Sequence, residues 1–165
     1  MGAKYTTKKD RLDEVTASLK SLKGRKVQIG ATGESGWLAG IHEYGCDIPV
    51  TPKMRAFLHS QGLHLSASTT VIHIPERSFL RTGHDENANK VMEQTERAIA
   101  QVVAGKMSVD QMLDLCGQQF ATAIKTYMRN LSTPANHPFT IDRKGSSNPL
   151  IDTGSLMESI SWKKV

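Results

Sequence analysis

A single apolar stripe in residues 108–131 constrains the fold more than any other part of the chain. Ser108 and Gln111 stand at its start with the spacing of a capping box, in which each side chain satisfies a backbone amide of the other residue. The pattern continues for about five turns and predicts one long amphipathic helix. Its apolar members are Met112, Leu113, Cys116, Phe120, Ile124, Tyr127, Met128 and Leu131.

Two other segments are expected to form amphipathic helices. The longer one, residues 85–104, carries an inward-facing set over roughly a third of a helical surface, and Gly105 then breaks the pattern. The shorter one, residues 9–22, is followed by Gly24 at the position of a C-terminal cap. The residues on these two faces are Ala88, Val91, Thr95, Ala98, Ile99, Val102 and Val103 in the first, and Leu12, Val15, Leu19 and Leu22 in the second.

Three segments have the alternating or β-branched character of strands: residues 26–31, 69–74 and 160–165. Residues 48–74 are interpreted as a hairpin-like excursion, and Pro75 ends it because proline cannot donate to a strand ladder. Together with the helices, this predicts a single α+β domain over residues 1–165. Its core would be a small, mainly antiparallel sheet with both long helices packed across one face.

Two segments lack a regular period. Glycines make residues 33–40 a mobile stretch around Trp37, which we expect to be ordered by a neighbouring subunit, and residues 41–45 resemble a short helix stopped by glycine. Residues 132–149 are predicted to be a long loop. Phe139 and Ile141 stand there among prolines, a composition that docks on a partner better than it folds alone.

Bulk properties exclude several classes of protein. The net charge of +5 is diffuse and no aromatic residues interleave with the basic ones, so specific DNA recognition is not expected, although the protein would tolerate nearby DNA. No stretch approaches the roughly 20 apolar residues that span a bilayer, so no membrane association is expected. The charged N-terminus lacks a signal-peptide core, and we expect synthesis in the cytoplasm.

No catalytic, cofactor or metal site is predicted. Asp152, Thr153 and Gly154 match the aspartic-protease tripeptide, but that chemistry needs two carboxylates and the chain has one copy. The histidines at 59, 64 and 73 are close in sequence, and two of them could lie on neighbouring strands of the hairpin. No cysteine or acid completes a ligand set, so we interpret all three as surface and strand residues.

Two segments about 70 residues apart stand out instead: Ile74–Arg81 and Asn148–Leu156. In both segments, proline ends an extended stretch and a capped turn follows. The residues predicted to fix the geometry of these turns are Pro75, Pro149, Asp152, Thr153 and Gly154. Asp152 or Thr153 is expected to cap a short helix. Arg77 and Arg81 bracket Phe79, an arrangement that suits a protein contact. In the alternative interpretation, Phe79 belongs to the core and both arginines are solvated. The second turn could equally be a local fold lock or a subunit contact.

This pair of segments resembles the neck proteins of tailed bacteriophages, which have a Pro-x-Arg-x-Phe-like element and, near the C-terminus, a Pro-Leu-x-Asp-Thr-Gly-x-Leu element before a last strand. The chain departs from the family pattern at Glu76 and at Ser78, where a second proline is common. The resemblance implies a tail-terminator-like fold, no enzymatic activity, and a homo-oligomeric ring, most often of six copies.

The function that the resemblance implies is tail completion, or head-to-tail joining, at the neck of the virion. Partners would be identical copies, the head-closure or connector protein, and the tail terminator or tail tube, with genomic DNA passing through the ring. A tail terminator or a head-closure stopper of the same neck remains an alternative. A DNA-binding protein is an alternative of another class, which a salt series in a gel shift would identify.

Overall fold

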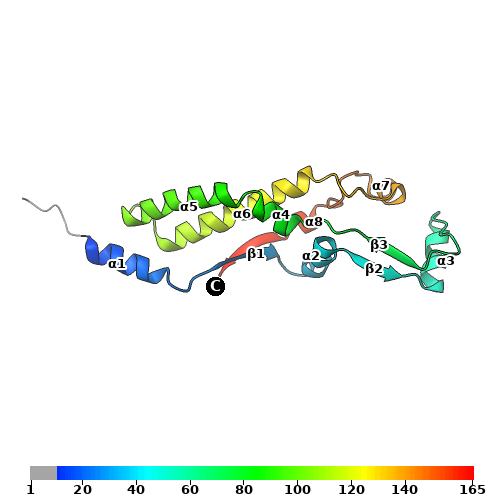
Figure 1. The fold of residues 1–165 in the computed structure, drawn as a ribbon, viewed down its shortest axis with the longest axis horizontal. Coiled ribbons are helices and arrows are strands. Elements are labelled where there is room, and N and C mark those ends of the chain that lie inside the picture. Colours follow the sequence, from blue (N-terminus) through cyan, green and yellow to red (C-terminus); the bar gives the residue numbers. More distant parts are fainter. Residues whose placement is uncertain (1–10) are drawn as a thin grey trace, which may run out of the picture.

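The computed structural model describes residues 11–165, in which eight helices and two separate two-stranded sheets form an elongated molecule (Figure 1). One antiparallel sheet pairs β1 (Val27–Ala31) with β4 (Ile160–Lys164), and the other pairs β2 (Cys46–Pro49) with β3 (Val71–Ile74). The first sheet lies near the middle of the long axis and the second projects toward one end. The predicted α+β class and the three predicted strands are confirmed: the first and the last of these strands pair in one sheet, and the remaining one belongs to the hairpin.

The long helix predicted from the apolar stripe is α6 (Val109–Asn130). Its capping box forms as expected: the Ser108 hydroxyl accepts from the Gln111 amide at 3.1 Å, and the Gln111 side chain accepts from the Ser108 amide at 2.9 Å. One face of α6 packs on the β1–β4 sheet, and its neighbouring faces pack on α4 (Phe79–Asp85) and α5 (Ala88–Val103). This helix is therefore the central support of the fold.

The contact between α6 and the sheet depends on a helical glycine. A Cβ atom at Gly117 would lie 2.3 Å from Cδ1 of Trp162, whose ring rests against the helix backbone at that point. The indole nitrogen of Trp162 donates to Asp114 at 3.4 Å, and Lys164 adds an ion pair to the same carboxylate at 2.8 Å. Only glycine leaves room for this approach of strand and helix.

The expected packing of both long helices on the sheet is wrong. α6 lies on the sheet, whereas α5 packs on α6 and on α1 (Leu12–Ser21), with a small second core between them. Neighbouring strands are about 5 Å apart while packed helices need 8–10 Å, so a two-stranded sheet is too narrow for two helices. Residues 9 and 10 of the predicted first helix lie outside the described part of the chain. The buried residues of the second core are Ala98, Val102, Val109, Met112 and Leu113.

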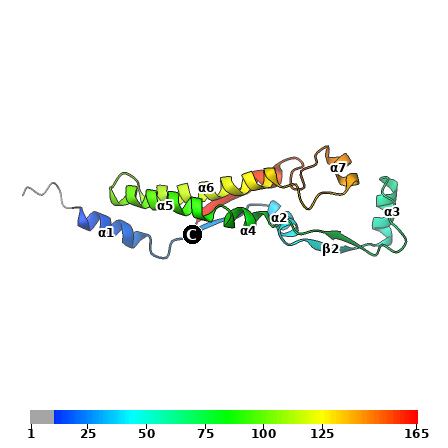
Figure 2. The ribbon, with the colours of Figure 1, turned by 45° about the horizontal axis from the view of Figure 1, so that its top comes forward.

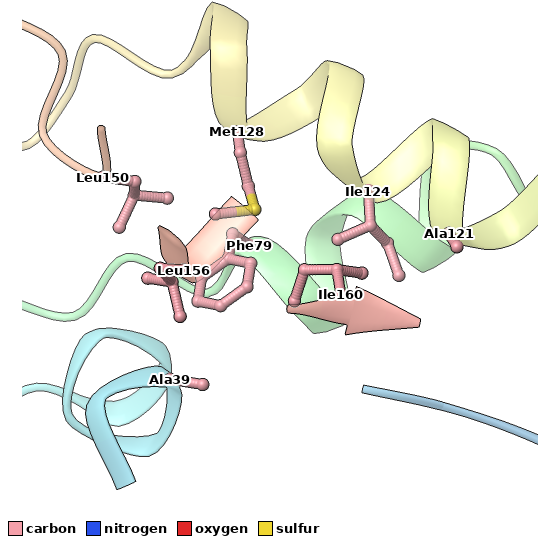
Figure 3. Close-up of a cluster of buried hydrophobic side chains, with 8 residues drawn as sticks. All are labelled: Ala39, Phe79, Ala121, Ile124, Met128, Leu150, Leu156 and Ile160. Atoms are coloured by element: carbon pink, nitrogen blue, oxygen red, sulfur yellow. The ribbon is translucent and has the colours of Figure 1, made fainter. Parts of the chain in front are cut away.

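The main core lies where α6, α4 and the sheet meet (Figure 3). Its least exposed large side chains are Phe79, Met128 and Ile160. Residues from both conspicuous sequence segments enter this one cluster, since Phe79 comes from the first and Leu150 and Leu156 from the second. The whole cluster comprises Ala39, Phe79, Ala121, Ile124, Met128, Leu150, Leu156 and Ile160.

Two segments expected to be irregular contain helices. The glycine-rich stretch is the first half of α2 (Ser35–Tyr44), which contacts α4 and α8 (Ser155–Glu158) and buries Ala39 in the core. Such packing overrides the poor helix propensity of its two glycines. The predicted loop 132–149 contains α7 (Pro138–Lys144), which starts with proline in the first turn and ends at Gly145 in the left-handed conformation. The predicted stop of α2 at Gly45 is confirmed.

Residues 46–74 form an arm, built from β2, α3 (Pro52–Ser60) and β3, that projects along the long axis (Figure 2). The hairpin-like excursion is confirmed. Thr51 caps α3 by accepting from the Met54 amide at 3.1 Å, and Pro52 occupies the first turn. The Arg55 guanidinium holds the return segment by donating to three carbonyl oxygens, those of Leu65, Ser66 and Thr69.

Candidate functional site

The arm joins the body at a junction formed by α2, the start of α4 and the turn at Pro75. We call Glu43, Arg77, Phe79 and Arg81, together with Gly45, the arm junction. Gly45 has φ of 70°, and a Cβ atom there would lie 2.7 Å from the Ile74 carbonyl oxygen and 2.8 Å from the Glu76 nitrogen. The two segments of the chain that cross at the base of the arm can approach this closely only because residue 45 has no side chain.

Glu43 is the central residue of the arm junction, and it is only 2% exposed. Its carboxylate accepts from the backbone amides of Leu80 at 2.8 Å and Arg81 at 3.0 Å, the second and third residues of α4. Ser78, at the N-cap position of α4, makes no capping bond, so a side chain from another helix performs that role. Negative charge at a helix N-terminus also interacts favourably with the helix dipole.

Arg81 completes the pairing of Glu43. Its Nε donates to the carboxylate at 2.9 Å, and its Nη2 donates to the Glu43 carbonyl at 3.1 Å and to Glu76 at 2.6 Å. The hydrogen bond to Glu43 is the main cause that raises the pKa of Arg81. The guanidinium also lies 4.9 Å from the centre of the Tyr44 ring, and the side chain remains about half exposed.

Arg77 holds a different part of the chain. It is 4% exposed, and its guanidinium donates to the carbonyl oxygens of Pro134 at 2.8 Å and Ala135 at 3.3 Å and to the Asn136 side chain at 3.1 Å. Burial lowers the pKa of this group. Arg77 thereby fixes the segment after α6 to the arm junction. The two arginines therefore have different partners: Arg77 precedes α4 and binds the segment after α6, whereas Arg81 lies within α4 and binds Glu43.

Phe79 has no exposed surface and fills the core (Figure 3). The structure therefore supports the core interpretation of this residue, and no surface for a partner remains on it. The alternative in which both arginines are solvated is not what the structure shows, because Arg77 is buried and Arg81 is paired. The arm junction is a structural clamp.

The second sequence segment is held by Asn148, which the sequence analysis did not single out. Its Oδ1 accepts from the amides of Leu150 at 2.9 Å and Ile151 at 3.0 Å, and its Nδ2 donates to the carbonyls of Met128 and Arg129 at 3.0 Å each. It therefore closes the turn and satisfies carbonyl groups at the end of α6. Asparagine before proline is a turn signal that could have identified it.

The predicted capping of the short helix by Asp152 or Thr153 is largely wrong. Gly154, with φ of 90°, is the N-cap of α8 and no side chain caps it, although the Thr153 hydroxyl accepts from the Ser155 amide at 3.3 Å. Asp152 and Thr153 are exposed, whereas Pro149 is buried. Asn148, which precedes the turn, stabilises it instead, because the free amides that need an acceptor belong to residues 150 and 151.

Asp152, His42 and Lys144 line a cavity of about 300 Å³ between α2, α7 and the second segment. Burial, with Arg77 and Lys144 nearby, lowers the pKa of His42 to about 4. Lys144 donates to the carbonyls of Asn148 at 2.9 Å and Pro149 at 3.5 Å, and burial lowers its pKa. Among the residues that line this cavity, no nucleophile is hydrogen-bonded to a base.

The remaining candidate residues lie apart from the arm junction. Trp37 and Tyr44 are 70% and 68% exposed and, seven residues apart, share one side of α2. Phe139 and Ile141 are half-buried on α7, where Arg143 lies 5.7 Å from the Phe139 ring centre and donates to Gln61 of the arm at 2.7 Å. The structure thus brings α7 to the arm, a contact with no signal in the sequence.

The histidines of the arm are arranged differently from the interpretation of two facing strands. His64 lies in the segment after α3, and its Nδ1 is 2.7 Å from the Nδ1 of His59, whereas His73 pairs with Asp47 at 2.6 Å. Within residues 11–165, no three His, Cys, Asp or Glu side chains are placed to hold a metal ion. In the same part of the chain, no helix has both the length and the apolar character needed to cross a bilayer.

The site is therefore a set of structural clamps beneath an exposed arm. Searches with this chain against protein-family models, curated proteins and solved structures found no match.

Proposed function

We propose that this protein is a structural component of a tailed-bacteriophage neck. In this proposal it completes the tail or joins it to the head, with a tail-terminator-like fold assembled as a ring, most often of six copies. The support comes from the two motif segments in the sequence and from the way both enter one core beneath the arm. A tail terminator and a head-closure stopper are variants of the same proposal, since all three work by shape.

The observation that carries the proposal is the arm. Its two strands pair only with each other, and no other described element packs extensively against them. Side chains alternate along the strands: Ile48 faces Ile72 and Cys46 faces Ile74 on one side, and none of the four is fully buried. An isolated two-stranded hairpin is marginally stable in water, so a second molecule that covers these strands would stabilise the arm.

The body of the protein supports the arm firmly. Glu43, Arg77 and Arg81 connect its base to α4 and to the segment after α6 through hydrogen bonds. Edge strands in the arm can accept a strand from another chain, which natural monomers avoid by covering their edges. A firmly supported arm with open edges suits a subunit that is completed on assembly.

The test is the mass and shape of the purified protein. Mass photometry over a range of concentrations and negative-stain images are expected to show closed rings with a single copy number, formed by the protein alone or on addition of its neck partners. In the phage that encodes the chain, a stop codon in this gene should leave separate heads and tails. A protein that stays monomeric with and without neck partners, or that phage particles do not require, would refute the proposal. A gel shift with a salt series identifies the DNA-binding alternative.

A further inference from the structure

The arm carries an outward-facing helical surface that combines apolar and positive character. On α3, the exposed residues follow the spacing i, i+3, i+4, i+7 and therefore share one side: Lys53, Ala56, Phe57 and Ser60. We call this the α3 face. Phe57 is 59% exposed in its centre, and α3 contains no acidic residue. Since Arg55 is held by the arm itself, Lys53 supplies the positive charge of this face.

A second exposed apolar surface lies on α5. Met92, Glu96, Ile99 and Val103 are spaced i, i+4, i+7, i+11 and all are exposed, which places them on one side of the helix. We call this the α5 stripe. Its three apolar members are 54%, 36% and 41% exposed, in chain order, and Glu96 lies among them. The stripe flanks the buried side of α5, roughly a third of a turn around the helix from Val91, Ala98 and Val102.

The two surfaces lie toward opposite ends of the long axis, with α3 at the tip of the arm and the C-terminal end of α5 in the other half of the molecule, on the same side of the centre as α1 (Figures 1 and 2). A chain cannot bring them together within itself without leaving this fold. Two different surfaces on opposite ends are what a head-to-tail contact between identical subunits requires, and such contacts form rings when the rotation closes.

We infer that the α3 face of one copy docks on the α5 stripe of the next copy. Phe57 packs between the apolar residues of the stripe, and Lys53 pairs with Glu96. The occupant is a second copy because both halves of the contact, apolar and charged, are present on this one chain. This inference rests on the proposed ring and names the contact that builds it.

A charge exchange tests the contact. Lys53→Glu and Glu96→Lys are each expected to weaken the association of copies by about tenfold or more, because like charges then face each other. The two together restore the opposite pair and should recover assembly. Arg97→Glu is the matched control: Arg97 is exposed on the other side of α5, and this variant should assemble like the wild type. Circular dichroism verifies that each variant is folded.

Disulfide trapping gives the direct measurement. In a background of Cys46→Ser and Cys116→Ser, the pair Phe57→Cys and Ile99→Cys should form, on oxidation, a ladder of covalent oligomers ending at the ring size. Either cysteine alone should give no ladder. If the wild type forms rings, the charge variants behave like the control and no ladder forms, this contact is refuted. The proposed ring would then have to be built by another contact. If the wild type forms no oligomer, alone or with neck partners, the proposed function fails as well.

Discussion

Replacing Glu43 by alanine should destabilise the protein more than the loss of any surface charge. The change removes the acceptor of the Leu80 and Arg81 amides while the surroundings stay buried. Loss of a helix cap costs about 1–2 kcal/mol, and an amide left unsatisfied in a buried place adds about 1–3 kcal/mol. The ion pair with Arg81 adds little to this, because that side chain is about half exposed and solvent screens the pair.

The expected loss for Glu43→Ala is therefore about 2–5 kcal/mol of unfolding free energy. With a urea dependence of about 2 kcal/mol per molar, the unfolding midpoint should fall by roughly 1–2.5 M. The measurement is urea unfolding followed by far-ultraviolet circular dichroism, at a protein concentration where only monomers are present. Glu43→Gln should be nearly as unstable, since its NH₂ group would face one of the two amide donors.

Glu76→Ala is the matched control. Glu76 pairs with the same guanidinium at 2.6 Å, but both partners are about half exposed. Its removal should cost less than about 0.5 kcal/mol. If the Glu43 and Glu76 variants lose equal stability, or if Glu43→Ala unfolds like the wild type, the capping role of Glu43 is refuted.

Four other substitutions test the clamps and the packing. Asn148→Ala removes four hydrogen bonds and should lower the free energy of unfolding in urea by about 2–4 kcal/mol. Asp152→Ala should change it by less than about 0.5 kcal/mol. If Asp152→Ala were the more destabilising of the two, the capping interpretation of Asp152 would be restored. Gly117→Ala should cost about 1–3 kcal/mol in thermal or urea unfolding, because its Cβ would overlap the Trp162 ring, and a neutral effect would contradict the close helix–strand contact. The pKa of His42 is lowered to about 4 from 6.5, so the unfolded chain binds a proton at this residue at a higher pH than the folded chain does. The free energy of unfolding should therefore fall as the pH drops from 6.5 to about 4, by at most about 3 kcal/mol. His42→Gln should lose this part of the pH dependence, and identical pH profiles of variant and wild type would exclude it.

The elements that the sequence predicts well are those whose signal is local. Spacing, capping and turn chemistry within a few residues predict the long helix α6, both strands of the β1–β4 sheet, and the arm. The sequence does not predict α7 or the first half of α2, because their helical conformation depends on contacts with distant elements. Two glycines and three prolines outweigh any local helical signal there.

For the candidate site, too, the sequence indicates which segments are important but not what each residue does. That residues 74–81 and 148–156 matter was visible from proline, turn residues and paired arginines in the chain. The roles of individual residues were not visible, because Glu43 lies 37 residues from the amide it caps and Asn148 lies 20 residues from a carbonyl it satisfies. A side chain that meets its partner across such a separation leaves no periodic pattern in the sequence.

The chain alone determined which segments become the long helix, the strands and the arm, since these depend on hydrogen bonds and hydrophobic periodicity within each segment. Only the tertiary structure decided that Phe79 is a core residue, that Arg77 is buried while Arg81 is half exposed, and that the arm stands uncovered. The physical reason is that burial and hydrogen-bond partners depend on which distant surfaces pack together, and a two-stranded sheet that holds one helix leaves the second to pack elsewhere.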